Sequence, residues 1–301
     1  MVNLKGNTVI TCIIPAYNEE KNISRVLEVI TNYNKFNEII VIDDGSKDNT
    51  SNIVKRFQKN NKKIKLIQND INLGKTAGVK KGVKYAMGNL IVSLDADLIN
   101  LTHENLDSLI QPVMYKEVSQ TILDRAGDRV PIWGWTNCAR FFGGERCLWK
   151  RDFQDIRILD SGGYLLEIVT NLHYIYREKI IRTIFCENLY TIHQYNKVAK
   201  IQGLLNYLKM SYKIVKRSGI INFIKQILWI EEDRFSIIYK LYRKIYYIRP
   251  VIGIIIVITN LLDGIWLYAW LNIKPFLLII EKWSLKPKYY IHAIKNWWLT
   301  R

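Results

Sequence analysis

The sequence lacks the features that mark several large classes of protein. Its 301 residues contain only four cysteines, with no CxxC pair and no histidine at ligand spacing, at positions Cys12, Cys138, Cys147 and Cys186. Scattered cysteines predict free thiols in a reducing compartment and argue against a disulfide framework or a zinc site. No repeat, low-complexity tract or Pro/Gly/Ser linker interrupts the chain. One large domain with a distinct tail is therefore expected.

Two common nucleotide-binding motifs are also absent. No GxxxxGK[ST] pattern occurs, and no GxGxxG follows the first apolar run. ATP-type phosphoryl transfer and nicotinamide chemistry are therefore disfavoured. The N-terminus, "MVNLKGNTVITCIIPAY", has no charged-then-apolar leader and runs directly into a predicted strand. The folded part is expected to face the cytosol.

Acidic residues are scarce, and most of the imbalance is at one end of the chain. The formal net charge is +17. Residues 1–150 carry 21 basic and 16 acidic groups, a net of +5, whereas residues 151–301 carry 23 and 11, a net of +12. AT-rich coding favours lysine but does not explain this asymmetry. The second half therefore predicts an anionic partner: nucleic acid, a phosphorylated substrate or anionic lipid.

Apolar runs alternate with amphipathic stretches over the first hundred residues. Strands are predicted over 9–17, 38–42, 63–69 and from residue 90, and helices over 23–33, 50–60 and within 72–87. This alternation predicts a parallel, doubly wound α/β sheet. Ligands of such sheets bind at the carboxyl ends of the strands.

Polar clusters occur where these predicted strands end. They are Asn18-Glu19-Glu20, Asp43-Asp44, Gly74-Lys75 and the pair Asp95 and Asp97. The two carboxylates of a D-x-D pair offer hard oxygen ligands for Mg²⁺ or Mn²⁺, which can in turn hold a diphosphate. Gly74 permits close backbone approach and Lys75 supplies a positive charge. Asp43 or Asp44 can accept hydrogen bonds from a nucleobase or ribose.

Three segments together resemble the nucleotide-sugar-binding half of family 2 glycosyltransferases of the GT-A fold. They are "CIIPAYNEEKNI", "IIVIDDGSKDNT" and "NLGKTAGVKKGVKYAMGNLIVSLDADL", in family order over roughly residues 8–100. The resemblance implies a Rossmann-like, mostly parallel sheet flanked by helices. It implies that Lys75 approaches the diphosphate and that Asp95 and Asp97 address metal and sugar. It also implies a set of residues around the nucleoside: Pro15, Ala16, Tyr17, Glu19 and Asp44.

The middle of the chain begins with a predicted helix and then becomes irregular. Residues 101–116 predict a helix with Thr102 as N-cap and Asn105 at the third position, with Leu101 packed on Leu106. A glycine-rich segment follows, containing Trp133 and Trp135. It predicts either a mobile loop over the substrate or an ordinary hairpin whose tryptophans pack in the core.

Two later segments resemble the acceptor half of the same family: "GGERCLWKRDF" (143–153) and "GGYLLEIVTNLHYI" (162–175). The resemblance implies that Gly144, Glu145, Arg146 and Glu167 line the acceptor pocket. Alternatively, Glu167 is a structural charge paired with Arg146 or Lys150. Asp97, Glu145 and Glu167 are the expected catalytic carboxylates, and Asp128, Glu145 and Glu167 are candidates for a base. A phosphate acceptor, already ionised, would need no base.

His193 is the one histidine with a predicted role. A lone histidine is more often structural than a metal ligand. The family resemblance, however, implies a metal-binding histidine after the last sheet strand, before a basic stretch. His193 is therefore expected to join Asp95 and Asp97 as the third ligand of Mg²⁺ or Mn²⁺.

From residue 201 the sequence changes character. A basic amphipathic helix suits either an anionic bilayer surface or packing on the rest of the chain. Residues 251–271 are long and apolar enough to span a membrane, but Asp263 opposes a full span. Attachment in the membrane plane is favoured, and a buried or dimerising helix is the soluble alternative. We therefore expect a catalytic domain over 1–200, with halves 1–100 and 101–200, and a membrane-associating helical region over 201–301 that also offers a homo-oligomer interface.

The sequence thus predicts a metal-dependent glycosyltransferase at the cytosolic membrane face. It would move a hexose from a UDP- or GDP-sugar to a lipid-linked acceptor, either a polyprenyl phosphate or a glycolipid. The nearest alternative is a soluble enzyme with a small phosphorylated acceptor, resembling glucosyl-3-phosphoglycerate synthase. A nucleic-acid-binding protein is not expected, and an inactive scaffold that has kept the fold is the remaining non-enzymatic alternative.

Overall fold

The computed structural model describes residues 8–125, 141–156 and 165–191, together with 216, 219, 221, 222, 225, 226 and 230–232. The chain divides into two compact units, and all of these residues belong to the larger one, Met1–Val130 with Asn137–Gly253. The boundary predicted at residue 200, the tryptophans 133 and 135, Asp128 and the apolar stretch 251–271 lie outside the described residues. In the part of the chain that is described, no helix is long and apolar enough to cross a bilayer.

Strands and helices alternate through the first hundred residues, as the sequence predicts. The elements are β1 (Ile10–Ala16), α1 (Ile23–Thr31), β2 (Glu38–Asp43), α2 (Thr50–Asn60), β3 (Ile64–Gln68), α3 (Lys75–Tyr85) and β4 (Leu90–Ser93). Every residue of β2 and β4 is buried, as in the interior strands of a parallel sheet covered on both faces.

The second part of the unit is less regular. It comprises β5 (Leu98–Ile99), α4 (His103–Met114), β6 (Gln120–Arg125), β7 (Arg146–Trp149), α5 (Lys150–Gln154), α6 (Leu165–Tyr176), β8 (Ile181–Cys186), β9 (Tyr190–Thr191) and β10 (Glu231–Glu232). Helix α4 begins with the predicted capping box, in which Thr102 and Asn105 each accept the other's backbone N–H. Strands β6, β7 and β8 are not among the predicted strands.

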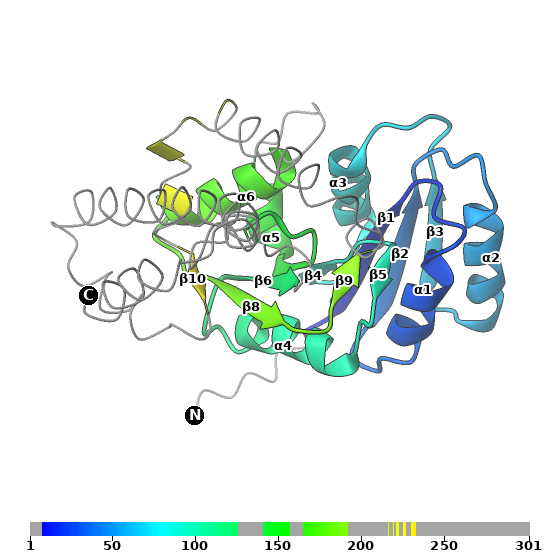
Figure 1. The fold of residues 1–301 in the computed structure, drawn as a ribbon, viewed down its shortest axis with the longest axis horizontal. Coiled ribbons are helices and arrows are strands. Elements are labelled where there is room, and N and C mark those ends of the chain that lie inside the picture. The colour runs from blue at the N-terminus through cyan, green and yellow to red at the C-terminus, as the bar shows by residue number, and fades with distance from the viewer. Residues whose placement is uncertain are drawn as a thin grey trace, which may run out of the picture. The chain divides into compact units, whose positions relative to one another are not determined.

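Among the described residues, one eight-stranded sheet has the order β10-β8-β6-β7-β4-β1-β2-β3. Strand β7 runs antiparallel to both β4 and β6, and the other neighbours in the sheet are parallel. Figure 1 shows α3, α5 and α6 on one side of this sheet and α1 and α4 on the other. The predicted α/β architecture, a mostly parallel sheet flanked by helices, is confirmed.

The main core lies between the sheet and the helices α1, α2 and α4. Alternate residues of β1, Cys12 and Ile14 among them, face this layer. Ile13 points to the opposite face, where it packs against Gly82 of α3 so closely that a Cβ on that glycine would clash. The two faces of β1 are therefore covered by different helices.

The register of the parallel strands brings their carboxyl ends to one edge. Ala16 at the end of β1 pairs with Asp43 at the end of β2, and Ile13 pairs with Ser93 at the end of β4. The polar residues that follow these strands therefore meet at this edge, together with the N-terminus of α3.

Candidate functional site

A pocket opens at this carboxyl edge of the sheet. It is lined by Pro15, Ala16, Tyr17, Glu19, Asp44, Asn72, Gly74, Lys75, Asp95, Ala96 and Asp97. Eight of these eleven residues are ones that the sequence predicts for donor or metal binding. They come from four separate segments of the chain, so the fold brings together residues that lie up to 82 positions apart, from 15 to 97.

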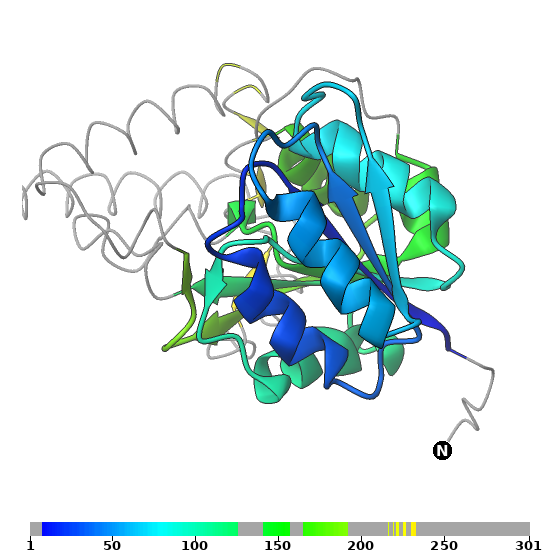
Figure 2. The same ribbon diagram turned by 90° about the vertical axis from the view of Figure 1, so that its right-hand side faces the viewer.

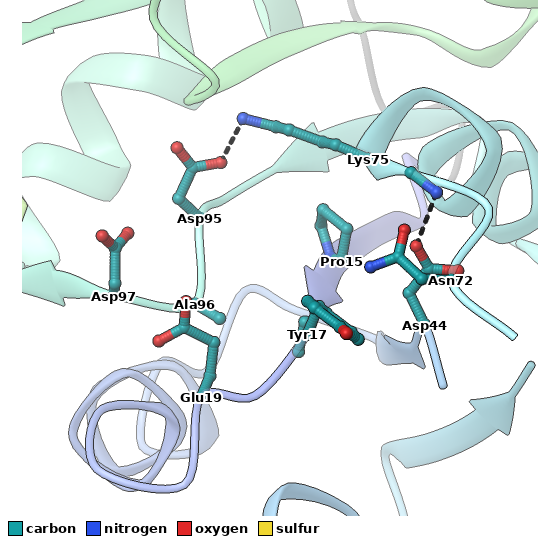
Figure 3. Close-up of a pocket in the computed structure, with 11 residues that line it drawn as sticks. Pro15, Tyr17, Glu19, Asp44, Asn72, Lys75, Asp95, Ala96 and Asp97 are labelled. Carbon is teal, nitrogen blue, oxygen red and sulfur yellow. Dashed lines mark hydrogen bonds and ion pairs between the residues drawn. The ribbon is translucent and has the colours of Figure 1, made fainter. Parts of the chain in front are cut away.

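The pocket has two chemically different ends (Figure 3). The carboxylates of Glu19, Asp95 and Asp97 lie toward one end, and Lys75 reaches from the start of α3 toward Asp95. Asp44 and Asn72 lie at the other end. One end therefore offers charged groups, and the other offers a carboxylate and an amide.

Asp44 fixes the shape of the second end. One of its carboxylate oxygens accepts from the Asn69 side chain at 2.7 Å and the Leu73 N–H at 2.9 Å. The other accepts from the Gly74 N–H at 2.7 Å. Gly74 has φ of +89°, a conformation that favours glycine, directly before α3. Asp44 therefore holds the whole loop between β3 and α3 against the strand end.

The charged end is organised around Lys75 and Asp95. Nζ of Lys75 lies 2.5 Å from Oδ1 of Asp95 and 3.8 Å from Oε1 of Glu167. Burial alone would lower the pKa of Lys75, but the carboxylates of Asp95, Glu167 and Glu145 outweigh it and raise that pKa. Burial would raise the pKa of Asp95, but Lys75 and Arg125 hold it below its usual value. Both groups are therefore charged at neutral pH.

Arg125, the last residue of β6, joins two carboxylates at the charged end. Its Nη1 lies 3.1 Å from Oε1 of Glu145 and 3.5 Å from Oδ2 of Asp95. Glu145 is fully buried, and this burial raises its pKa to about 7 even though Arg125 and Lys75 act in the opposite direction. Asp95 is thus held by a cation on each of its two oxygens.

Gly144 packs directly against this cluster. A Cβ at position 144 would overlap Nζ of Lys75 and Oδ1 of Asp95. Only glycine leaves room for the ion pair at this position. Gly144, which the resemblance assigns to the acceptor pocket, therefore lies against the charged end of the pocket.

Glu167 and Arg146, which the resemblance assigns to the acceptor pocket, are not among the residues that line this pocket. Glu167 is buried on α6, and the sequence offers Arg146 or Lys150 as its structural partner. It forms an ion pair with Lys75, whereas Lys150 bonds the Ala86 carbonyl. Arg146 donates to the carbonyls of Gly143 and Phe141 and, at 2.7 Å, to Asn171 of α6. Burial lowers the pKa of Arg146 to about 10.

Asp43 has a different environment from Asp44. It is buried, and its carboxylate accepts from the Ser46 N–H at 3.0 Å, from the Ser51 hydroxyl and from Gln68. These contacts shape the turn after β2. Asp44 lines the pocket, and Asp43 supports the loop that carries it.

The carboxylates of the pocket suit a hard divalent cation. Asp95 and Asp97 lie on the same side of the pocket as Glu19 (Figure 3), and magnesium commonly binds to one or two protein carboxylates plus substrate phosphates. Within the described ranges there is no cluster of three or more His, Cys, Asp or Glu side chains arranged to hold a metal. His193, the predicted third ligand, lies outside those ranges. Asp95 and Asp97 therefore offer such an ion a partial ligand set, in which Lys75 and Arg125 would compete with the ion for the oxygens of Asp95.

Sequence reasoning missed three residues that contribute to the site. Asn72 and Ala96 line the pocket, and Arg125 holds Asp95 and Glu145. Asn72 is the first residue of the quoted segment that begins "NLGKTAGVKK". Its place between a predicted strand and a predicted helix could have identified it. Arg125 ends "QTILDR", an apolar run closed by charged residues, which is the same signal that marks the other strand ends.

Comparison with known proteins identifies a family with this arrangement. The model of the family described as "Glycosyl transferase family 2" matches residues 11–185. That range begins in β1 and ends in β8, so it contains every described residue of the site.

Curated relatives match about a third of the chain. An uncharacterised protein of Methanocaldococcus jannaschii is 39% identical over 117 residues, covering 37% of this chain and 48% of that protein. A dolichyl-phosphate beta-glucosyltransferase of Trichomonas vaginalis is 35% identical over 97 residues, covering 29% of this chain and 30% of the enzyme. The chain thus matches less than half the length of these relatives.

Solved structures resemble a larger part of the chain. Glucosyl-3-phosphoglycerate synthase of Mycobacterium tuberculosis, in complex with Mn²⁺, UDP and glucosyl-3-phosphoglycerate, superposes with a TM-score of 0.56 at 16% identity. The match covers 72% of this chain and 82% of that one. At this identity the likeness concerns the fold.

Proposed function

The chain belongs to glycosyl transferase family 2, and on that premise we propose that it transfers a hexose from a nucleoside-diphosphate sugar to a lipid-linked acceptor. The acceptor would be a polyprenyl phosphate or a glycolipid, and the reaction would take place at the cytosolic face of a membrane. The observation that carries this proposal is the two-ended pocket at the carboxyl edge of the sheet. Its ends match the two halves of an activated sugar nucleotide.

The nucleoside would lie at the end formed by Tyr17, Asp44 and Asn72. Tyr17 is 42% exposed at the pocket and offers an aromatic face for a base. Asp44 is fully engaged with the loop before α3, so its contribution would be to shape this end and add negative charge. Asn72 offers both a donor and an acceptor to a base or ribose.

The diphosphate would lie at the end formed by Lys75, Asp95 and Asp97. Lys75 is also the first residue of α3, where unpaired backbone N–H groups and the helix dipole favour a negative group. Mg²⁺ or Mn²⁺ held by Asp97 and Asp95, with His193 as the predicted third ligand, would supply positive charge that stabilises the departing nucleoside diphosphate. Lys75 would share this work from the opposite side.

The acceptor would approach from the side of Gly144, Glu145 and Glu167. Both glutamates are buried, and in the described residues Oε2 of each has no hydrogen-bond partner. Either oxygen could accept a proton or a hydrogen bond from an acceptor hydroxyl. A phosphate acceptor would need neither, so the choice between polyprenyl phosphate and glycolipid determines whether a base takes part.

The lipid acceptor is supported by the relatives. Dolichyl-phosphate beta-glucosyltransferases of Trichomonas vaginalis are among them, and by name they act on a lipid phosphate. The second candidate is a soluble transferase with a small phosphorylated acceptor, which the fold likeness to glucosyl-3-phosphoglycerate synthase favours. The two differ in where the enzyme and product are found.

A donor screen tests the proposal. UDP-glucose, UDP-galactose, UDP-N-acetylglucosamine and GDP-mannose are each supplied with Mg²⁺ or Mn²⁺, and nucleotide release is measured with polyprenyl phosphate or 3-phosphoglycerate as acceptor. We expect release with one donor, dependence on the lipid acceptor, and loss with EDTA. Asp97→Asn should weaken the metal dependence, whereas Asp70→Asn, an exposed carboxylate that does not line the pocket, should not. Release with 3-phosphoglycerate alone would favour the second candidate, and no release with any donor would refute both.

A further inference from the structure

The excess positive charge of the first half of the chain is concentrated in one segment. Residues 50–90 contain ten basic residues and one acidic residue, Asp70, a net of +9. Residues 1–49 carry five basic and seven acidic groups, and residues 91–150 carry six and eight, so each flank has a net of −2. A general bias toward lysine would not leave both flanks acidic. The positive charge of residues 50–90 therefore needs an explanation specific to this segment.

The fold places this segment along one edge of the sheet. It comprises α2, β3 and α3, and β3 is the last strand in the sheet order. In Figure 2 the blue helix α2 and the cyan helix α3 lie on either side of this edge. Lys81 of α3 bonds Asn69 just beyond β3, and Lys65 of β3 reaches Met87 beyond α3, so that helix runs alongside the strand. We call this surface the β3 edge.

Most cations of the β3 edge face solvent. Lys55, Arg56, Lys59, Lys62, Lys65 and Lys84 are all exposed. Of these six exposed cations, Lys65 forms an ion pair with Glu38, and the other five form none with another described residue. The positive charge of these exposed side chains is therefore largely uncompensated by the described residues and favours an anionic partner.

Exposed apolar side chains lie at both ends of the β3 edge. Tyr85 and Met87, at the end of α3, are 54% and 68% exposed. Ile71 and Leu73, in the loop after β3, are 67% and 50% exposed and flank the pocket residue Asn72. Apolar side chains among cations are typical of surfaces that lie in the lipid headgroup region, with the apolar groups inserted and the cations at the phosphates. They add little to a contact with a nucleic-acid backbone.

We propose that the β3 edge is a docking surface for an anionic membrane. The choice of a membrane rests on the proposed function, because a lipid-linked acceptor requires the pocket to face a bilayer. Docking through this edge would insert Ile71 and Leu73 next to the mouth of the donor pocket. The headgroup of a lipid-linked acceptor would then be presented beside the bound sugar. This surface is formed by residues 50–90, whereas the membrane association predicted from the sequence concerns residues 201–301.

Two matched variants of the full chain test this surface. The edge variant replaces Lys59, Lys62 and Lys84 with glutamine. The control variant replaces Lys21, Lys116 and Arg151 with glutamine, which removes the same charge from exposed positions elsewhere. Binding is measured by sedimentation with vesicles of phosphatidylcholine, with or without about a quarter phosphatidylglycerol.

Each basic side chain at an anionic leaflet changes binding by about fivefold, so the edge variant should bind the anionic vesicles about a hundredfold more weakly. The control variant should lose less than about fivefold. Tyr85→Ser with Met87→Ser should weaken binding further at high salt, where charge contributes less. Equal losses in the edge and control variants, or no loss in the edge variant, would refute the surface.

A nucleic-acid partner is a separate outcome of the same experiment. If the edge variant loses binding to a single-stranded oligonucleotide but keeps its vesicle binding, the surface serves nucleic acid and the membrane assignment is wrong. With polyprenyl phosphate supplied in detergent in place of vesicles, nucleotide release should be equal in all variants, because none of the changed residues lines the pocket. If the wild-type chain releases no nucleotide, the proposed function fails, but the vesicle result still decides the surface.

Discussion

The ammonium group of Lys75 lies 2.5 Å from Oδ1 of Asp95, although the two residues are 20 positions apart. The pair joins the first residue of α3 to the exit of β4. Because both groups line the pocket, the diphosphate of the proposed donor would meet a lysine that is already held by a carboxylate. Such preorganisation reduces the rearrangement that binding requires.

Replacing Lys75 with glutamine should weaken donor binding. A hydrogen bond from a charged donor contributes about 1.5–3 kcal/mol, so the KM for the sugar nucleotide should rise by roughly 10- to 100-fold. Lys84→Gln, on the same helix but away from the pocket, should leave this KM unchanged in the absence of vesicles. Steady-state kinetics and calorimetric titration with the nucleoside diphosphate measure the effect. Similar changes in the two variants would contradict a direct role for Lys75.

Arg125→Gln should damage the site through Glu145 and Asp95 rather than through the substrate. Removing the arginine leaves Glu145 buried without its nearest cation, and breaking a buried pair in this way typically costs about 3–5 kcal/mol of stability. We expect a lower Tm and, well below that Tm, a kcat reduced by at least about tenfold. Arg125→Lys should restore part of kcat, because it keeps the charge but not both contacts. A variant with normal kcat at low temperature would show that Arg125 is only structural.

The sequence predicts the first half of the fold well because two signals coincide there. Strands such as "EIIVID" contain a continuous apolar run. Each run is followed by polar or charged residues, which are typical of a turn or a ligand site. The parallel register then brings these ends together, which is why eight predicted residues line one pocket. The prediction needed no knowledge of the side-chain contacts.

The acceptor half was harder to predict, for physical reasons. Strand β7 runs antiparallel and is only four residues long, so "RCLW" gives no alternation that identifies it. Arg146 in that strand donates to backbone carbonyls, and a sequence pattern cannot identify which carbonyls a side chain will bond. Glu167 pairs with Lys75, which lies 92 positions away, and no local sequence pattern predicts this contact. Residues that touch backbone or distant side chains are therefore visible only in the fold.

Glu145 should make stability fall as the pH rises from about 5 to 7. Its pKa is about 7 in the folded chain and 4.5 in its ordinary state, so in this window the unfolded chain has released a proton that the folded chain keeps. Stability decreases with pH where the folded state binds more protons, and the total loss would be about 3 kcal/mol. Glu145→Gln should flatten the profile between pH 5 and 7, measured by urea unfolding with EDTA present. Parallel profiles for the two proteins would contradict the raised pKa.

Gly144 offers the sharpest test of the packing at the site, because it has a matched control. A Cβ at position 144 would overlap the Lys75–Asp95 pair, so Gly144→Ala should separate these two groups or shift the 143–144 turn. A displacement of about 1 Å at a reacting centre can cost around a hundredfold in rate, and we expect kcat/KM to fall by at least about tenfold. The far-UV spectrum and Tm should change little, because the backbone around the turn is not otherwise altered.

Gly78→Ala is the control, since Gly78 also lies beside the pocket but has room for a side chain. Its added Cβ would meet the Pro15 Cβ at 3.4 Å, an ordinary contact, within the interior of α3. Alanine is favoured over glycine in a helix by roughly 1 kcal/mol, so this variant should be slightly more stable and fully active. Equal activity in the two alanine variants would mean that the Lys75–Asp95 contact does not matter for turnover. A loss confined to Gly144→Ala, together with a raised KM like that of Lys75→Gln, would tie the glycine to the same ion pair.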